Sequence, residues 1–455
     1  MPRADRTRLP LPGADPEFTL PVFERADLAG GTAVRVAEHR RAPLLTLHLL
    51  LPTGYAADPP DKPGLASLTA ALFEEGSAGL SAVELDAALK RIGGHLSTAV
   101  SSDATVVALT VLSQHAAAGL RLLFEITMQP RLDAEDVARE RDLRVNRIRQ
   151  QRQSPGAIAD RVYLETLYGE HPYGHLSIGT ESALRSIEPA HVAAFHRRGY
   201  TAAPWTLVAA GDVAPADFIT EAERAWTAVA TPVDRSPAAT AAPDPPPAGE
   251  RMVFVARDGA VQSEIRLGHV GPPRRSPDYH ALMVLNMVLG GQFVSRVNQN
   301  LREAKGYTYG ASTAFDWRVG RGPFRVQTSV QTTATVDAIR EAVREVVDIR
   351  GSRPPSDQEL AVAQAALTRG FPRTLETSAQ IVRAGVQIAL HGLPADAYAQ
   401  FPNRIAAVGA ADVRRAAERH LHPGALVAVV VGSRPEVFDG LAGLGFGAPV
   451  ERGAD

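Results

Sequence analysis

The apolar residues of this chain fall into two successions of strand-like and helix-like segments. In the first succession, strands are predicted at TAVRVAEH (32–39), LLTLHLLLP (44–52), TVVALTVLS (105–113) and TLVAAG (206–211). Helical spacing of apolar residues predicts helices at 64–76, 82–92, 116–128, 134–153, 156–168 and 189–198. Ser81, with Glu84 three residues later, forms a capping box, so the second helix begins at Ala82 and ends before Gly93-Gly94.

The same order of segments recurs in the second part of the chain. Strands are predicted at EIRLGHV (264–270), TYGASTAF (308–315), FRVQTSV (324–330) and LVAVVVG (426–432), and helices at 277–289, 295–304, 334–349, 356–370 and 376–391. Leu89 and Gly94 recur as Leu301 and Gly306, 212 residues later. We therefore predict an α+β fold of two homologous domains that arose by duplication of one unit.

A segment rich in proline and alanine, TPVDRSPAATAAPDPPPAGE, separates the two parts. Its composition favours a semi-extended linker, because it holds too few large apolar residues for a packed core. The predicted organisation is an N-terminal extension (1–17), a first domain (18–230), the linker (231–250), a second domain (251–443) and a C-terminal tail (444–455).

Charge and cysteine content exclude several classes of protein. The 455 residues carry a formal net charge of −2, so neither nucleic acid nor a membrane is an expected partner. The absence of cysteine excludes disulfides and thiolate metal sites. The first residues lack the apolar core of a secretory signal, and no apolar run is long enough to span a bilayer. We expect a soluble, cytoplasmic protein.

Three longer stretches carry a family resemblance. They are LLTLHLLLPTGYAADPPDKPGLASLTAALFEEGS (44–77), EHPYGHLSIGTESALRSI (170–187) and LGGQFVSRVNQNLREAKGYTYGAST (289–313). In order and spacing they resemble three parts of the pitrilysin/insulinase-like inverzincin peptidases of the mitochondrial-processing-peptidase type, especially the small bacterial two-subunit members. These parts are the zinc-motif helix, the His-Pro-x-Gly segment and the second-domain Arg/Tyr segment. The resemblance implies two sandwich domains, each a mainly antiparallel sheet covered by helices.

The zinc ligands of that family are missing from this sequence. The family motif H-x-x-E-H places two histidines one helical turn apart, with the glutamate as general base. The corresponding positions hold Ser67, Ala70 and Ala71, and none of these side chains can serve as a ligand or a base. The third ligand, a glutamate about 76 residues further on in the family, falls in residues 146–148, which have the sequence NRI. We therefore expect this chain to bind no metal or other cofactor, and a partner subunit to bind zinc.

The second-domain residues of the family are present. Arg302 and Tyr309 match its arginine and tyrosine, which implies that they bind the peptide and stabilise an oxyanion at a partner's zinc site. The alternative is that Arg302 caps its helix and Tyr309 is a half-buried strand residue. Gly290 and Gly291 permit close backbone approach, either as a wall of the substrate-binding chamber or as a helix end that packs.

Three functions are compatible with a peptidase fold that lacks its metal ligands. We predict the non-metal-binding subunit of a heterodimeric zinc metallopeptidase, inactive on its own, whose partner is a homologous subunit carrying H-x-x-E-H. Its substrate would be an extended peptide that adds a strand to a sheet edge. The alternatives are a catalytically inactive scaffold subunit and a peptide-binding homodimer.

Overall fold

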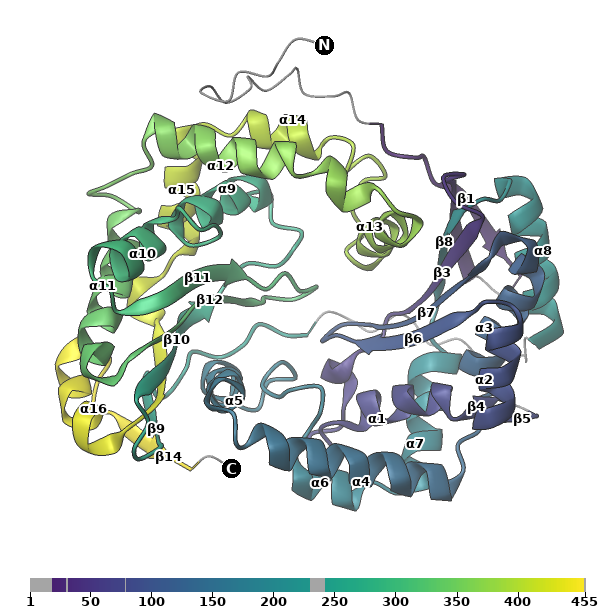
Figure 1. Cartoon of the computed structure of the whole chain (residues 1–455), viewed down its shortest axis with the longest axis horizontal. Helices are drawn as coiled ribbons and strands as arrows, with labels where there is room; N and C mark the ends of the chain where they lie inside the picture. Colours follow the sequence, from purple (N-terminus) through teal and green to yellow (C-terminus); the bar gives the residue numbers. More distant parts are fainter. Residues whose placement is uncertain (1–18, 30–31, 78, 230–241, 454–455) are drawn as a thin grey trace, which may run out of the picture.

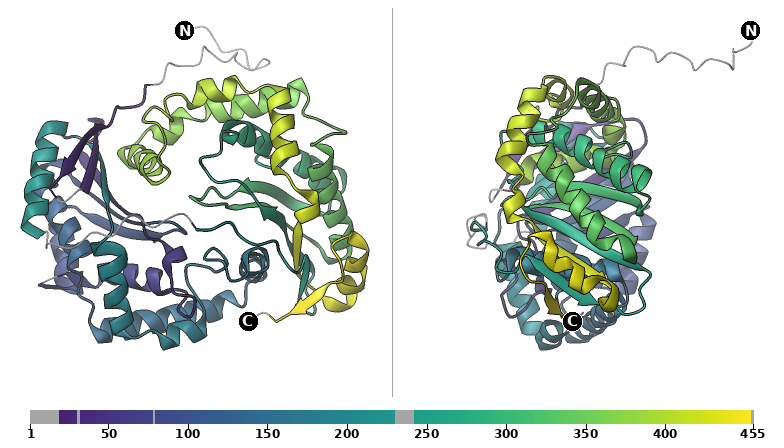
Figure 2. Two further views of the ribbon diagram at one scale, coloured as in Figure 1. Left: turned by 180° about the vertical axis from the view of Figure 1, so that it is seen from behind. Right: turned by 90° about the vertical axis from the view of Figure 1, so that its left-hand side faces the viewer.

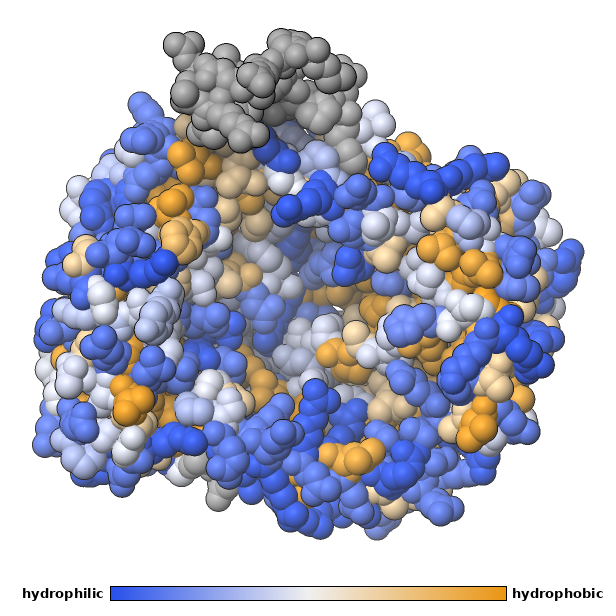
Figure 3. Space-filling model, in the orientation of Figure 1, coloured by the Kyte–Doolittle hydropathy of each residue, from blue (hydrophilic) through white to orange (hydrophobic). Residues whose placement is uncertain are grey.

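The structure is a computed structural model that describes residues 19–29, 32–77, 79–229 and 242–453. Two six-stranded sheets lie on opposite sides of the molecule, and helices cover the outer face of each (Figure 1). Figure 2 shows the two halves from behind and edge-on, and Figure 3 shows a hollow between them. The predicted α+β class with two sheet-containing domains is confirmed. The extension expected at 1–17 lies outside the described residues, as does most of the linker.

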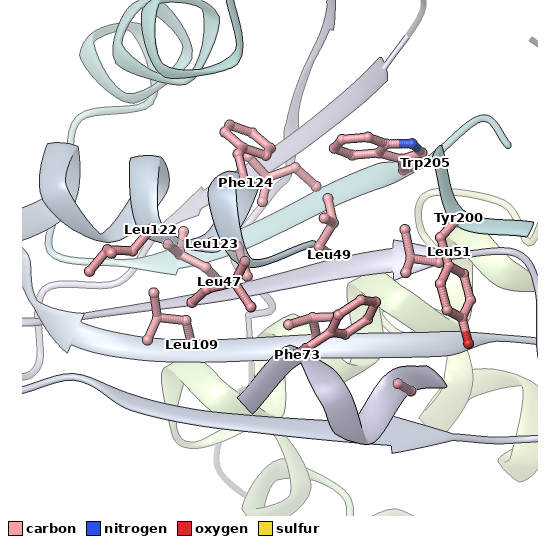
Figure 4. Packing of buried hydrophobic residues seen from close by; sticks show 14 of the residues in the cluster. Leu47, Leu49, Leu51, Phe73, Leu109, Leu122, Leu123, Phe124, Tyr200 and Trp205 are labelled. Carbon is pink, nitrogen blue, oxygen red and sulfur yellow. The ribbon is translucent and has the colours of Figure 1, made fainter. Parts of the chain in front are cut away.

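The first sheet is built around a strand that is covered on both faces. Its order is β1-β2-β8-β3-β7-β6, in which β2 and β8 pair in parallel and the other neighbours are antiparallel. The central β3 is apolar at nearly every position because helices pack on both of its sides. On the outer side, Leu47, Leu49 and Leu51 share one core with Phe73 and Trp205 (Figure 4). The strands are β1 (Glu24–Leu28), β2 (Thr32–Glu38), β3 (Leu44–Leu51), β6 (His95–Val100), β7 (Thr105–Leu112) and β8 (Thr206–Gly211).

The helices of the first half match most of the predicted segments. Ser81 and Glu84 form the predicted capping box, with the Ser81 amide 2.9 Å from the Glu84 carboxylate. The sequence did not predict β1, β4, β5, β6 or α8; β6 lacks an apolar run because only alternate residues are partly buried at the sheet edge. The elements are α1 (Leu65–Ala71), β4 (Gly76–Ser77), β5 (Leu80–Ser81), α2 (Ala82–Arg91), α3 (Ala116–Met128), α4 (Ala134–Gln151), α5 (Pro155–Tyr168), α6 (Glu181–Ser186), α7 (Pro189–Phe195) and α8 (Pro215–Val229).

The second sheet repeats the order of the first, since β14-β9-β13-β10-β12-β11 corresponds to β1-β2-β8-β3-β7-β6. Its strands are β9 (Met252–Ala256), β10 (Gln262–Val270), β11 (Thr308–Phe315), β12 (Pro323–Gln331), β13 (Val427–Gly432) and β14 (Val450–Arg452). The predicted C-terminal tail (444–455) contains β14, which pairs in parallel with β9. This strand has three residues and no apolar run, but it completes the hydrogen bonding of the β9 edge.

The helices of the second half include one irregular turn that shifts the repeat. The helix predicted at 295–304 consists of α10 and a π-helical turn, η5 (Gln299–Ala304), which contains one residue more than an α-turn. The glycine that follows this turn in the left-handed conformation is Gly306 (φ 65°). In the first half, the left-handed glycine at the corresponding helix end is Gly93 (φ 61°), whereas the sequence analysis matched Gly94 to Gly306. The helices are α9 (Tyr279–Leu289), α10 (Arg296–Asn298), α11 (Thr335–Asp348), α12 (Asp357–Arg369), α13 (Ser378–Leu390), α14 (Phe401–Ala406), α15 (Ala410–His420) and α16 (Arg434–Leu441).

The two halves exchange one helix each. Helix α5 comes from the first half of the chain but packs on the inner face of the second sheet, and α13 comes from the second half but packs on the first sheet (Figure 1). The α5 contact is a core of its own that includes Val162 and Val429, and the α13 contact includes Ile381 and Val208. Each half therefore buries the inner face of the other half's sheet.

A polar contact joins the tips of the two sheets. The Tyr173 hydroxyl donates to the Asp103 carboxylate of the β6–β7 turn and accepts from the Gly320 amide, 3.1 Å away, in the β11–β12 turn. Asp103 also accepts from the Val319 amide at 3.0 Å. The guanidinium of Arg318 lies 4.7 Å from the centre of the Tyr173 ring. These contacts fix the relative position of the two halves next to the central hollow.

Candidate functional site

The positions of the missing zinc motif lie on α1, at the centre of the first half. Asp58 holds the start of this helix, because its carboxylate accepts from the amides of Gly64 (2.7 Å) and Ala66 (2.6 Å). Ser67 and Ala70 on α1 are buried. The Ser67 hydroxyl donates to a backbone carbonyl, that of Ser177. These contacts fix the position of α1, but its buried side chains Ser67 and Ala70 include no zinc ligand.

A guanidinium group occupies the space in front of Ser67. Arg144 of α4 donates from Nη1 to Ser67 Oγ at 3.0 Å and from Nη2 to the Ser67 carbonyl at 2.6 Å. Burial lowers the pKa of Arg144 from its usual value, and the group remains a cation at neutral pH. A fixed positive charge beside a hydroxyl and two alanines does not fit Zn²⁺. Within the described parts of the chain, no three or more His, Cys, Asp or Glu side chains are grouped so that they could hold a metal ion.

The window predicted for the third ligand on α4 (146–148) does not contain the residue that contacts Ser67. In the predicted window, Asn146 and Arg147 are exposed, and Ile148 belongs to the apolar core. The residue that reaches Ser67 is Arg144, one helical turn before Ile148. Spacing by four on one helix face was the signal that could have identified it.

Arg302 lies on the π-helical turn η5 and is partly exposed. Its guanidinium stacks on the exposed ring of Phe293, 4.0 Å from the ring centre. Nη1 lies 3.6 Å from the Glu303 carboxylate, too far for a hydrogen bond, and has no hydrogen-bond partner among the described residues. Nη1 of Arg302 is therefore a buried donor that no described group satisfies.

Tyr309 stands on a β-bulge of the edge strand β11. The register shifts between Thr308 and Ala311, so Tyr309 and Gly310 form the bulge. The Thr308 hydroxyl braces it by accepting from the Gly310 amide at 3.0 Å and donating to the Ser329 carbonyl at 2.6 Å. The Tyr309 side chain is 92% exposed, so the alternative of a half-buried strand aromatic does not hold.

The glycine pair ends α9 and supports β11. Gly290 is buried, and a Cβ atom there would lie 2.5 Å from the Thr313 side chain. Its carbonyl accepts from the Thr313 amide at 3.1 Å, and the Asn298 side chain accepts from the Ala311 amide at 2.9 Å. Gly291 is exposed. Gly290 thus packs the end of α9 on the strand that carries Tyr309.

Comparison with known proteins places this geometry in a family. Residues 34–181 match the family described as Insulinase (Peptidase family M16), and residues 186–367 match Peptidase M16 inactive domain. Together the two matches cover more than half of the chain. The chain belongs to the M16 peptidase family.

Relatives of this M16 protein come from several bacteria. It is 27% identical to an uncharacterized zinc protease of Mycobacterium bovis, over 66% of this chain and 68% of the relative. It is 24% identical to an uncharacterized zinc protease of Streptomyces coelicolor, over 81% of each chain. Among solved structures, a peptidase M16 inactive domain from Pseudomonas fluorescens superposes with a TM-score of 0.83 and 25% identity, over 90% of this chain and 98% of that one. A protease from Helicobacter pylori has the same fold (TM-score 0.80, 18% identity, 90% and 100% coverage).

The resemblance inferred from the sequence is therefore confirmed at the level of the family. This M16 chain is peptidase-like, and its positions 67–71 do not contain H-x-x-E-H. Ser67 lies on α1 of the first half, and Tyr309 lies on β11 of the second half. No helix in the described residues is long and apolar enough to cross a membrane.

Proposed function

We propose that this chain is the zinc-free subunit of a heterodimeric M16 metallopeptidase. A homologous partner carrying H-x-x-E-H supplies zinc and the general base, and this chain supplies Arg302 and Tyr309. The observation that carries the proposal is the contrast between the two halves. In the first half, Arg144 contacts Ser67 at the position of the missing zinc motif. In the second half, Tyr309 lies on a bulge that a hydrogen bond from the Gly310 amide to the Thr308 hydroxyl stabilises, and its side chain is exposed.

In this proposal, each of the two side chains binds a different part of the substrate. Arg302, whose side chain is partly exposed, donates to carbonyl oxygens of the peptide. Tyr309 donates its phenolic proton to the oxyanion of the tetrahedral intermediate. Stacking on Phe293 limits the rotamers of Arg302, so less side-chain entropy is lost on binding.

The structure also limits which sheet edge could receive the peptide. Strand addition requires free backbone amides on an edge strand. In β11 the amides of Ala311 and Thr313 are already bonded to Asn298 and Gly290. We therefore propose that the peptide pairs with the edge strand of the partner that corresponds to β6. This chain then contacts the peptide through side chains.

Co-purification with a zinc-bearing partner would test the proposal. Loss of one oxyanion donor costs on the order of 3 kcal/mol of barrier, so Tyr309→Phe should lower kcat about 100-fold with little change in KM. Tyr307→Phe is the matched control, since it removes a phenol two residues away that is half-buried against the core. Full activity of the Tyr309→Phe complex would contradict the assigned role. Peptide binding by the chain alone, with no cleavage when the partner is added, would favour a peptide-binding homodimer.

A further inference from the structure

Arg144 is a cation inside the first half that the proposed function does not use. Two of its nitrogens bind the Ser67 hydroxyl and carbonyl, and its Nε atom is buried without a hydrogen-bond partner in the described structure. Across the described ranges, no carboxylate lies within ion-pair distance of it. The nearest acidic influences are Glu140, one turn earlier on α4, and Asp58, which already caps α1.

Such a burial needs surroundings that favour positive charge. Removing a guanidinium from water is costly unless carbonyls, hydroxyls or carboxylates replace the lost hydration. Burial lowers the pKa of Arg144, while Glu140 and Asp58 act in the opposite direction. The carbonyl and hydroxyl of Ser67 supply the direct contacts. The surroundings as a whole disfavour the charged form of Arg144, and its two hydrogen bonds to Ser67 are the direct contacts that hold the guanidinium between α1 and α4.

We propose that Arg144 is a fixed cation in the position where a catalytic M16 half binds zinc. It links α4 to α1 through Ser67, and it prevents zinc binding even when the missing ligands are restored. The guanidinium and Zn²⁺ repel each other and compete for the same space in front of α1. On this proposal, the missing metal ligands and the arginine at position 144 both act to prevent zinc binding in this half.

The test uses the full chain and zinc sulfate, with three variants. The first is Ser67→His/Ala70→Glu/Ala71→His, the second adds Arg144→Ala, and the third adds Arg147→Ala. Both added changes remove one cation and introduce no new ligand. Arg147 is exposed on the same helix and its charge acts on Arg144, but it does not contact Ser67. Zinc is measured by calorimetric titration and by metal analysis after dialysis. We expect stoichiometric zinc only in the variant with Arg144→Ala.

Two results would overturn the proposal. One is equal zinc uptake by a variant that retains Arg144, and the other is a failure of the Arg144→Ala variant to take up more zinc than the other two. Thermal unfolding tests the structural part in the natural background. Arg144→Ala should lower the melting temperature and Arg147→Ala should leave it unchanged; equal melting temperatures would refute the link between α4 and α1. Neither readout needs a partner or activity, so the result stands apart from the proposed function.

Discussion

Because α5 and α13 each pack on the sheet of the other half, a destabilising substitution in one of these helices should lower the stability of the half on which it packs. Ile381 of α13 is encoded in the second half but is fully buried against the first sheet, in a cluster with Val208 and Leu50. Ile381→Ala removes three methyl or methylene carbons from this contact. Substitutions of this kind cost about 2–5 kcal/mol, because the cavity relaxes only in part. A typical domain is stable by about 5–15 kcal/mol, so the loss is a large fraction of the total.

Tryptophan fluorescence can assign this loss to a half. Trp205 and Trp226 belong to the core of the first half, and Trp317 packs against the core of the second. In a Trp317→Phe background, the signal reports on the first half alone. We expect Ile381→Ala to lower the urea midpoint of this signal by about 1 M, given a slope of a few kcal/mol per M.

Val362→Ala on α12 is the control, because the Val362 side chain is 41% exposed and its loss should shift the midpoint little. An unchanged first-half midpoint in Ile381→Ala, with a shift only in the far-ultraviolet signal, would refute the coupling. Two separate transitions in the natural chain would refute it as well.

Three further predictions follow from the same contacts. Proteolysis in the linker (231–250) should leave both fragments together on a sizing column, because each fragment covers the other's sheet; separate elution would count against the exchange. Gly290→Ala should cost about 1–3 kcal/mol by overpacking against Thr313, whereas Gly351→Ala, which meets open space, should be neutral in the same denaturation assay. Burial lowers the pKa of four histidines to about 4: His48, His269, His280 and His391. The unfolded chain therefore binds more protons between pH 6.5 and 4, so stability should be constant above this range and fall within it by up to about 1.4 kcal/mol per pH unit for each histidine. A melting temperature that does not fall between pH 7.5 and 5 would contradict this.

The sequence predicts local structure well where one signal controls it. The capping box of Ser81 and Glu84 depends on residues three positions apart, and the structure contains it. The strand β3 is predicted because burial on both faces makes six of its eight residues leucine, with Thr46 and His48 the two polar positions. The short edge strand β14 has no such signal, since its three residues gain structure only from the free edge of β9.

Long-range placement is harder to predict from the sequence. The apolar face of α13 predicts that this helix packs on another element. It does not predict that this element is the sheet of the first half. The absence of ligands at Ser67, Ala70 and Ala71 follows directly from the family alignment. The identity of the residue opposite them does not, because it depends on the relative rotation of α1 and α4. Arg144 was therefore missed, although an arginine nearby was expected.

The measurement that tests the account most directly is the zinc content and activity of the complex with the H-x-x-E-H partner. We predict one zinc ion per pair of chains, bound to the partner, and peptidase activity only when both chains are present. Stoichiometric zinc in this chain alone, or full activity of the partner without it, would contradict the account.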